Sequence, residues 1–375
     1  MIINRNRYRF GDILEEVSMP IKMDDNQLYN LASIKRRNGG LVDREKKKGK
    51  DILTKTLSKL IPGSFVISKM QVVHGACAMV PIDIDEKYIS ASYVSFLPRD
   101  TSIIDIGYLN AYSHTRQSYD SFFRSSHGVH IEKMTFKVNQ WLKEEIELPS
   151  LTEQKKIVKI LSAIDKEISN ISSKIKQINH LSTAITKKLF RSVKSDFMLL
   201  SEVSNNHDSL RVPIKSEERL GRIGPYRYFG ASGVIDRIDD YLFDGNYILI
   251  GEDGANIIER NKPLAFKVSG KFWVNNHAHV IQPNNLCDIN YLTHYLESLD
   301  YKSIAAGSAQ PKITRSALNS IRVPIPSLDS QKKIGAAIES TLNVSRNLKE
   351  KKKKLIDLKY GISNDLLTGK IKVNI

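Results

Sequence analysis

A long stripe of apolar residues runs through the middle of the chain. From Ile157 to Leu189, apolar side chains recur at alternating steps of four and three residues, with one interruption at Ser182. This spacing is typical of a helix that packs along another helix. Because Pro149 ends the preceding segment, the pattern predicts a helix from about 151 to 192.

A second copy of this stripe lies 177 residues further along. LPSLTEQKKI at 148–157 matches IPSLDSQKKI at 325–334, and the pairing continues without a gap as far as Leu189 and Leu366. The second stripe is poorer, because polar residues occupy several of its positions: Thr341, Ser345, Lys352 and Lys359. A helix with one apolar stripe needs a partner, so the repeat predicts a tandem duplication whose two helices pair antiparallel. In the alternative arrangement, each helix packs along its own globular domain.

The regions between the helices have a mixed pattern. Short runs rich in β-forming residues occur at 64–73, 88–97, 247–253, 264–270 and 272–282. Short helices are expected around 105–122 and 288–301. We therefore expect an α+β fold with a pseudo-twofold internal repeat, in which two globular mixed α/β domains are joined by two long antiparallel helices forming an intramolecular coiled coil. The expected domains are 1–148 and 196–325, and the expected helical segments are 149–195 and 326–375.

The net charge of the chain indicates what kind of partner it binds. The 375 residues include 57 Lys and Arg against 41 Asp and Glu, a net charge of +16, which favours a polyanionic partner. The excess is concentrated in the expected helices, where 149–195 has 10 basic against 3 acidic residues and 326–375 has 11 against 5. The N-terminal residues lack the apolar core of a secretory signal, and no window resembles a membrane span, so we expect a cytoplasmic protein without membrane contact.

Common catalytic motifs are missing from the sequence. The chain has neither the GxxxxGK[ST] phosphate loop nor the Asn/Asp-Pro-Pro-aromatic tetrapeptide of methyltransferases. Asp83, Asp85 and Lys87 resemble a nuclease motif, but their setting favours an exposed turn. His277 and His279 alternate in HAH without a third ligand, which disfavours a metal site. The two cysteines, Cys77 and Cys287, lie far apart and are expected to be buried apolar residues.

The paired helix-opening segments resemble the repeated conserved regions of type I restriction-modification specificity subunits. In that family a proline, a leucine and a glutamine open a long helix; here the motif consists of Pro149, Leu151, Glu153, Gln154 and Ile157, and again of Pro326, Leu328, Gln331 and Ile334. The second copy has Ser330 where the first has Glu153. Further family-like strings occur at 40–51, 62–76, 124–134, 228–256 and 307–314.

The resemblance implies a subunit that is not itself catalytic and binds no cofactor. Its two target-recognition domains would read an asymmetric bipartite sequence in double-stranded DNA, with the helices setting the gap. Its partners would be two methylation subunits, which use S-adenosylmethionine, and two restriction subunits, which use ATP and Mg²⁺. Two alternatives are a standalone coiled-coil DNA-binding regulator without enzyme partners, and an enzyme whose site escaped detection.

Base contacts are expected from loop residues with hydrogen-bond donors, because Arg pairs with guanine and Gln or Asn with adenine. The candidates are Arg36, Arg44, Lys69, Gln71, Arg124, Ser126, His127, Tyr228, Ser232, Asn256, Arg260, Ser308, Gln310 and Lys312. The charge run EKKKGK at 45–50 is either a phosphate contact or a solvated loop. On the second helix, Lys351, Lys353 and Lys354 are expected to face the DNA backbone or an acidic partner subunit.

Overall fold

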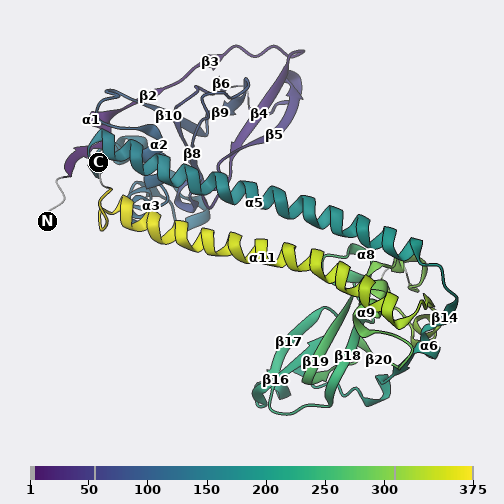
Figure 1. The fold of residues 1–375 in the computed structure, drawn as a ribbon. Helices are drawn as coiled ribbons and strands as arrows, with labels where there is room; N and C mark the ends of the chain where they lie inside the picture. The colour runs from purple at the N-terminus through teal and green to yellow at the C-terminus, as the bar shows by residue number, and fades with distance from the viewer. Residues whose placement is uncertain (1–4, 55, 308–309, 374–375) are drawn as a thin grey trace. The chain divides into compact units, whose positions relative to one another are not determined.

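A computed structural model describes residues 5–54, 56–307 and 310–373, which fold into two compact units (Figure 1). Unit 1 comprises Met1–Asn170 and Lys352–Ile375, and unit 2 comprises Ile171–Lys351. Each unit therefore contains one globular region together with part of each long helix.

Unit 1 contains a five-stranded and a four-stranded sheet. The five-stranded sheet has the order β3 (Pro20–Ile21), β6 (Leu57–Lys59), β9 (Tyr88–Ser90), β4 (Leu28–Ile34) and β5 (Leu41–Lys48). The four-stranded sheet has the order β2 (Leu14–Val17), β10 (Tyr93–Pro98), β7 (Phe65–Ser68) and β8 (Cys77–Met79). Two-stranded ribbons pair β1 (Asn6–Arg9) with β13 (Glu145–Leu148), and β11 (Ser126–His127) with β12 (Thr135–Phe136).

Short helices close the core of unit 1. They are α1 (Phe10–Ile13), α2 (Ile106–Tyr112), α3 (Arg116–Arg124) and α4 (Val138–Trp141), with 3₁₀ turns η1 (Gly49–Asp51), η2 (Val72–His74) and η3 (Ile131–Lys133). At the centre of the core, the Trp141 ring stacks on Phe10 with centroids 4.2 Å apart, and Phe96, Phe122 and Phe136 surround it. These buried aromatic rings account for much of the apolar area that stabilises a domain of this size.

The charge run at 45–50 is not a loop. Its first part belongs to β5, the edge strand of the five-stranded sheet, which pairs with β4 from Leu41 opposite Ile34 to Lys48 opposite Leu28. Charged side chains on an edge strand oppose pairing with a second chain. The loop interpretation was therefore wrong, because the sequence pattern carries no sign that a strand lies at an edge.

Unit 2 is built on one six-stranded sheet. Its order is β15 (Ser204–Asn206), β20 (Ala278–Pro283), β18 (Phe243–Gly251), β19 (Ala265–Val274), β16 (Ile223–Gly230) and β17 (Gly233–Ile238). A ribbon pairs β14 (Phe197–Leu199) with β21 (Arg322–Pro324). The short helices are α6 (Leu200–Val203), α7 (Ser216–Leu220), α8 (Asn256–Glu259), α9 (Ile289–Ser298) and α10 (Arg315–Asn319), with 3₁₀ turns η4 (Asp208–Leu210) and η5 (Tyr301–Ser303).

The two predicted long helices are present. Helix α5 spans Leu151–Ser192 without a break, as the apolar stripe predicted, and α11 spans Leu328–Leu367 (Figure 1). From Ile157 to Leu189, the residues of the α5 stripe are buried or half-buried, whereas most of the residues between them are exposed. Both helices also contribute to the domain cores, since Ile157 and Leu366 lie in the core of unit 1. The two arrangements that the sequence left open, helix against helix and helix against domain, therefore coexist.

Polar residues in the stripes form bonds between the helices. In unit 2, Ser182 and Thr341 hydroxyls lie 2.9 Å apart, and Ser345 donates to Asn179 at 2.6 Å, so positions rise along α5 as they fall along α11. This order is that of an antiparallel pair. In unit 1, Lys359 pairs with Asp165. The interruption at Ser182 is thus a hydrogen-bonded position between the helices, and three of the four weak positions of the second copy, Thr341, Ser345 and Lys359, also bond to α5.

Replacing Ser182 with alanine is expected to lower the free energy of unfolding by about 1 kcal/mol, because one partly buried hydrogen bond is lost. The double variant Ser182→Ala and Thr341→Val should lower the free energy of unfolding by no more than the single variant. It removes both hydroxyls, so neither is left between the helices without the other. Urea unfolding of the four proteins of this double-mutant cycle measures the difference. Additive costs would contradict a bond between the two residues.

The repeated glutamine fastens α5 to the globular part of unit 1. Gln154 is fully buried, and its amide oxygen accepts the backbone N–H of Asp105 at 2.9 Å. Its amide nitrogen donates to the carbonyls of Ile103 at 2.8 Å and Pro149 at 2.9 Å. Asp105 is the residue that caps α2. One side chain therefore holds the first turn of α5 against the start of α2.

Gln331 makes the same three contacts in unit 2. Its amide oxygen accepts the N–H of Asp288 at 2.7 Å, and its amide nitrogen donates to Leu286 at 3.0 Å and Pro326 at 2.9 Å. Asp288 caps α9. The most specific residue of the duplicated motif is therefore a structural clamp in both copies.

The structure also tests the predictions for the two cysteines, for residues 81–87 and for membrane-spanning helices. Cys77 and Cys287 are buried and free, and burial raises the pKa of each thiol to about 12. Residues 81–87 form an exposed turn, in which Lys87 pairs with Asp43. Within the part of the chain that the structure describes, no helix combines the length and apolar content needed to cross a bilayer.

Candidate nucleic-acid interface

Three segments of unit 1 that are distant in sequence converge. The turn between β4 and β5 joins the segment around η2, where Arg37 donates its N–H to His74 at 2.7 Å and Asn38 donates to Gly75 at 3.0 Å. The third segment, 126–137, joins through the N–H of Phe136, which donates to Lys69 at 2.7 Å. The convergence brings together the predicted residues Arg36, Lys69, Gln71, Ser126 and His127.

The turn of unit 1 is held in an unusual backbone conformation. Arg37 and Asn38 have φ of 56° and 54°, a region that non-glycine residues rarely adopt. The Tyr119 hydroxyl donates to the Asn38 side chain at 3.2 Å, and Gly75 leaves room for both, since a Cβ there would lie 2.1 Å from the Tyr119 hydroxyl oxygen. Packing therefore fixes how the cations of this turn are presented.

Positive charge gathers on these segments. Lys35 and Arg37 are exposed on the turn, and Lys133 and Lys137 are exposed on the third segment. Arg36 pairs with Glu132 at 2.7 Å, and its side chain remains about half exposed. Exposed cations on convergent loops are suited to contact phosphates, while a guanidinium beside them can reach a base edge.

Two predicted residues of unit 1 lie outside this convergence. Arg124 ends α3 and pairs with Glu144, whose carbonyl accepts from the N–H of Phe10 near the β1–β13 ribbon. Arg44 lies on β5 beside Glu45, with 3.3 Å between the charged atoms, and lines a cavity of about 460 Å³. Neither is brought near Arg36 by any bond described above.

Ser126 joins the convergence but faces inward. Its side chain is buried, and its hydroxyl donates to the carbonyl of Phe122 at 2.7 Å. His127 beside it is exposed and lies 2.5 Å from the Gln140 amide oxygen. We therefore remove Ser126 from the candidate interface and retain His127.

Four segments converge in unit 2. Three backbone hydrogen bonds join three of them. The N–H of Gly254 donates to the carbonyl of Pro311 at 3.1 Å, that of Ile313 to the carbonyl of Glu252 at 2.8 Å, and that of Glu252 to the carbonyl of His277 at 2.9 Å. The β16–β17 turn lies against the same place, because a Cβ on Gly251 would come within 2.6 Å of the Ala231 carbonyl oxygen. The convergence includes the predicted residues Ser232, Asn256, Gln310 and Lys312, of which Gln310 and Lys312 are exposed.

Asn256 and Arg260 are occupied by structural bonds. The Asn256 side chain accepts from the N–H of Lys262 at 2.9 Å and donates to its carbonyl at 3.1 Å, which closes the loop between them. Arg260 pairs with Glu297 at 2.9 Å and lies over the Tyr301 ring, 5.8 Å from its centroid. Both side chains are therefore held by bonds within unit 2, although Arg260 Nη1 is buried without a hydrogen-bond partner among the described residues.

Tyr228 is part of the core of unit 2. It is fully buried, and its hydroxyl accepts the N–H of Ile214 at 3.0 Å beneath the guanidinium of Arg219. We therefore remove Tyr228 from the candidate interface. Ser308 lies outside the described residues.

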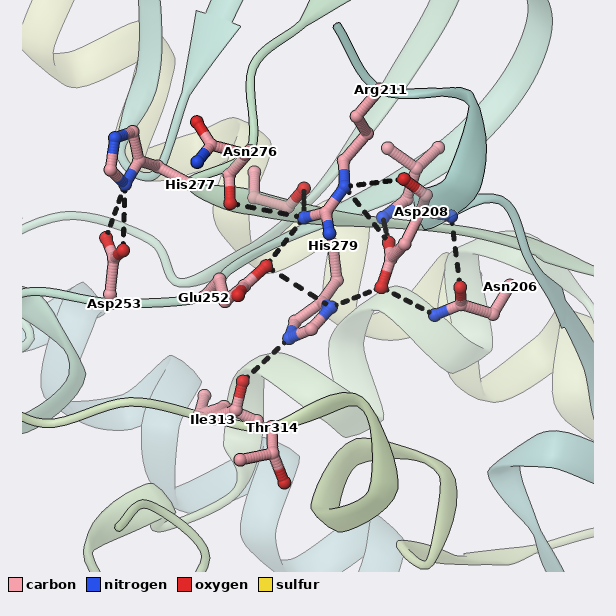
Figure 2. A network of polar contacts seen from close by, with 12 residues as sticks. Asn206, Asp208, Arg211, Glu252, Asp253, Asn276, His277, His279, Ile313 and Thr314 are labelled. Carbon is pink, nitrogen blue, oxygen red and sulfur yellow. Dashed lines mark hydrogen bonds and ion pairs between the residues drawn. The ribbon is translucent and has the colours of Figure 1, made fainter. Parts of the chain in front are cut away.

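A network of buried charges underlies the convergent segments of unit 2 (Figure 2). Arg211 donates to Glu252 at 2.6 Å and to the carbonyl of Ala278 at 2.8 Å, and His279 lies 2.6 Å from Asp208. Although burial alone raises the pKa of Asp208, the hydrogen bond and charge of His279 outweigh it and lower that pKa. Apart from the HAH pattern, nothing in the sequence indicates this network.

The two histidines of the HAH pattern have different environments. His277 precedes β20, is exposed and pairs with Asp253 at 2.8 Å, whereas His279 is buried against Asp208 (Figure 2). Among residues 5–54, 56–307 and 310–373, no group of three or more His, Cys, Asp or Glu side chains is arranged to hold a metal ion.

The sequence is similar to a known family of proteins. The family model "Type I restriction modification DNA specificity domain" matches twice, at residues 9–180 and 193–358. The chain is 34% identical over 148 residues to a putative type I restriction enzyme specificity subunit of Haemophilus influenzae, a match that spans 40% of this chain and 37% of that protein. It is 25% identical over 335 residues to the type I restriction enzyme MjaVIII specificity subunit of Methanocaldococcus jannaschii, spanning 78% and 76%.

The fold has solved counterparts. A crystal structure of the type I restriction-modification system S subunit from M. genitalium matches with a TM-score of 0.63 at 15% identity, covering 100% of this chain and 97% of that one. A structure of a type I restriction-modification system that concerns complex assembly and conformational transition matches with a TM-score of 0.62. Both similarities show the fold: two mixed α/β domains and two long helices.

Proposed function

The chain belongs to the type I restriction modification DNA specificity family, and on that premise we propose that it is the DNA-reading subunit of a restriction-modification complex. Each unit reads one half of an asymmetric bipartite target in double-stranded DNA. The long helices set the number of unspecified base pairs between the halves. Half-sites about one helical turn apart, on the order of 34 Å, are reached from one side of the duplex.

One observation carries this proposal. Each of the two family domains has its own set of convergent segments, and the two sets differ in their polar groups: Lys35, Arg36 and Arg37 in unit 1, Gln310 and Lys312 in unit 2. Exposed cations bind phosphates irrespective of sequence, whereas guanidinium and amide groups discriminate base edges. Different groups in the two units are what an asymmetric target requires.

We assign catalysis to partner subunits. In this proposal two methylation subunits use S-adenosylmethionine, two restriction subunits use ATP and Mg²⁺, and this chain holds no cofactor. Leu181 and Leu358 occupy equivalent positions of the repeat, and both are exposed, at 57% and 52%. Apolar side chains at equivalent exposed positions suit a partner present in two copies.

Each unit also has a cavity at an equivalent position of the repeat. Leu161 and Asp165 line a cavity of about 370 Å³ in unit 1, and Ile338 and Leu342, 177 residues later, line one of about 590 Å³ in unit 2. Two similar hollows, each beside a short helix of its own unit, support docking of one kind of partner twice. The exposed residues Lys353 and Lys354 of α11 remain predicted contacts to DNA or to an acidic partner, together with Lys351.

The function is tested by mapping methylated adenines in host DNA with and without this gene. A bipartite methylated sequence should disappear when the gene is removed. Exchanging residues 1–148 for those of another family member should then change one half of that sequence and leave the other half intact. Unchanged methylation would favour the standalone DNA-binding regulator, and a change in both halves would contradict the division of reading between the units.

Replacing Lys35 and Arg37 together by alanine is expected to weaken DNA binding about equally for all sequences. The slope of log affinity against log salt should fall by about 2, because two phosphate contacts are lost. The matched control replaces Arg116 and Lys143, two exposed cations of unit 1 outside the convergent segments. Fluorescence anisotropy over a salt series measures both slopes. Equal slopes for the variant and the control would show that the turn does not contact phosphates.

A further inference from the structure

The His279 ring bridges two parts of unit 2. It lies on β20 with 1% of its surface exposed. Its Nδ1 is 2.6 Å from Asp208 Oδ2 on η4, and its Nε2 is 2.8 Å from the backbone carbonyl oxygen of Ile313 (Figure 2). Both ring nitrogens therefore face an oxygen at hydrogen-bond distance.

Both of these oxygens can only accept. A backbone carbonyl has no proton to give, and the pKa of Asp208, which burial alone raises, is lowered by its bonds to His279, so Asp208 is a carboxylate near neutral pH. A neutral imidazole carries one N–H and an imidazolium carries two. The two bonds can therefore exist together only when the His279 ring is an imidazolium.

The groups packed around the ring carry charges of both signs. Asp208 faces it from η4, and Glu252 Oε2 lies 3.8 Å from Nδ1 at the end of β18. Arg211 and Lys312 bind the same glutamate, at 2.6 Å and 3.1 Å. With the imidazolium, three cations face two carboxylates, and losing the ring proton leaves two charges of each sign. The ring itself is buried, whereas Lys312 is half exposed at the edge of the cluster.

The bond to Ile313 acts on the exposed residues beside it. Ile313 is fully buried. Its N–H donates to the backbone carbonyl of Glu252, and its carbonyl accepts from the His279 ring. Gln310 and Lys312, the exposed donors proposed for the second half-site, immediately precede it. The ring thus fixes the end of the segment that carries them.

We propose that His279, as an imidazolium, is a positioning residue that holds the segment 310–313 for reading the half-site of unit 2, so that discrimination at this half-site weakens as pH rises. The proposal rests on the proposed function of the chain. A ring with one N–H satisfies either Asp208 or Ile313. The loss therefore either releases the segment or removes one of the donors of a buried carboxylate, which keeps its bonds from Val280 and Asn206.

The test uses the full chain assembled with its methylation subunits, after the methylated sequence has been mapped. Duplexes altered in one half-site or in the other compete for binding between roughly pH 5 and pH 8, the range in which histidine side chains in general change charge. For the wild type, discrimination at the half-site of unit 2 should fall across this range. His279→Gln should lower it about tenfold at neutral pH, because a charge-assisted bond is lost, and should remove its pH dependence.

His277→Asn is the matched control, since it removes the other histidine of the HAH pattern, which is exposed and pairs with Asp253 at the surface. It should leave the pH profile of the second half-site in place, and neither variant should change the profile of the first. Wild-type-like discrimination by His279→Gln, or equal losses at both half-sites, would overturn the proposal. If His279→Gln does not fold, the wild-type measurement alone tests the proposal. Discrimination at the half-site of unit 2 that does not change with pH would refute it. Absence of any methylated sequence would instead refute the proposed function.

Discussion

Gln154→Ala is expected to lower the free energy of unfolding of unit 1 by about 4 kcal/mol. The variant removes three hydrogen bonds from a fully buried side chain. It also leaves the N–H of Asp105 and the carbonyls of Ile103 and Pro149 without that partner. An unpaired buried polar group costs more than the net gain of making the bond, so the loss exceeds the sum of three ordinary bonds.

The two tryptophans make this measurement specific to a unit. Trp141 is buried in unit 1 and Trp273 in unit 2, and the chain contains two tryptophans in all. Guanidinium unfolding followed by fluorescence in a Trp273→Phe background therefore reports on unit 1. Gln331→Ala should destabilise unit 2 to a similar extent in the complementary Trp141→Phe background.

Two further variants separate the clamp from general disturbance of the helix start. Gln154→Glu retains an acceptor for Asp105 but loses both amide donors, so it should be at least as destabilising as alanine. Lys155→Ala changes the exposed neighbour and should fall within about 0.5 kcal/mol of wild type. A Gln154→Ala protein as stable as Lys155→Ala would show that the clamp contributes little.

Arg211→Met is expected to lower the free energy of unfolding of unit 2 by about 3 kcal/mol at pH 7. Methionine replaces the aliphatic stem but not the charge. The variant leaves Glu252 buried without its shortest ion pair and leaves the carbonyl of Ala278 without its donor. Breaking one partner of a buried pair is costly because the remaining charge has lost both water and its counter-ion.

This cost should depend on pH in a defined direction. Burial alone raises the pKa of Glu252, but bonds from Arg211 and Lys312 outweigh it and lower that pKa in the folded protein. A lowered pKa contributes stability that is present above the unfolded value of about 4.3 and is lost as pH falls. The difference between wild type and Arg211→Met should therefore shrink below roughly pH 4.

Trp273 fluorescence in a Trp141→Phe background follows the unfolding of unit 2 at each pH. The matched control is Arg346→Ala, because Arg346 pairs with Glu339 at 2.6 Å on the exposed side of α11, within unit 2. An exposed pair contributes little, so this control should change stability by less than about 0.5 kcal/mol at any pH. A pH-independent cost for Arg211→Met would mean that packing of its stem, and not its charge, stabilises the network.

The sequence predicted the long elements well because their pattern is local. The apolar stripe located α5 from Leu151 to Ser192, and the duplication located α11. Short strands were found where β-branched residues cluster, as in β7 and β18. The edge strand β5 was missed, since a charged strand at an edge has no alternation to distinguish it from a loop.

The candidate interface was predictable only in part. Residue type suggested Arg36 and Lys312, which lie on convergent segments, but it also suggested Tyr228, whose hydroxyl is used in the core. Burial is decided by contacts between distant positions, which a single sequence does not reveal. The same holds for the network of unit 2, where Asp208 and His279 are 71 residues apart in sequence.

The two glutamine clamps have a consequence for how such chains diversify. On the globular side, each clamp binds main-chain atoms alone: the N–H of a helix cap and a carbonyl two residues before it. Main-chain atoms are the same whatever side chains surround them. A recognition domain can therefore accumulate substitutions and still bind the glutamine at the start of the helix. The same holds when a whole domain is exchanged by recombination, because the helices stay unchanged.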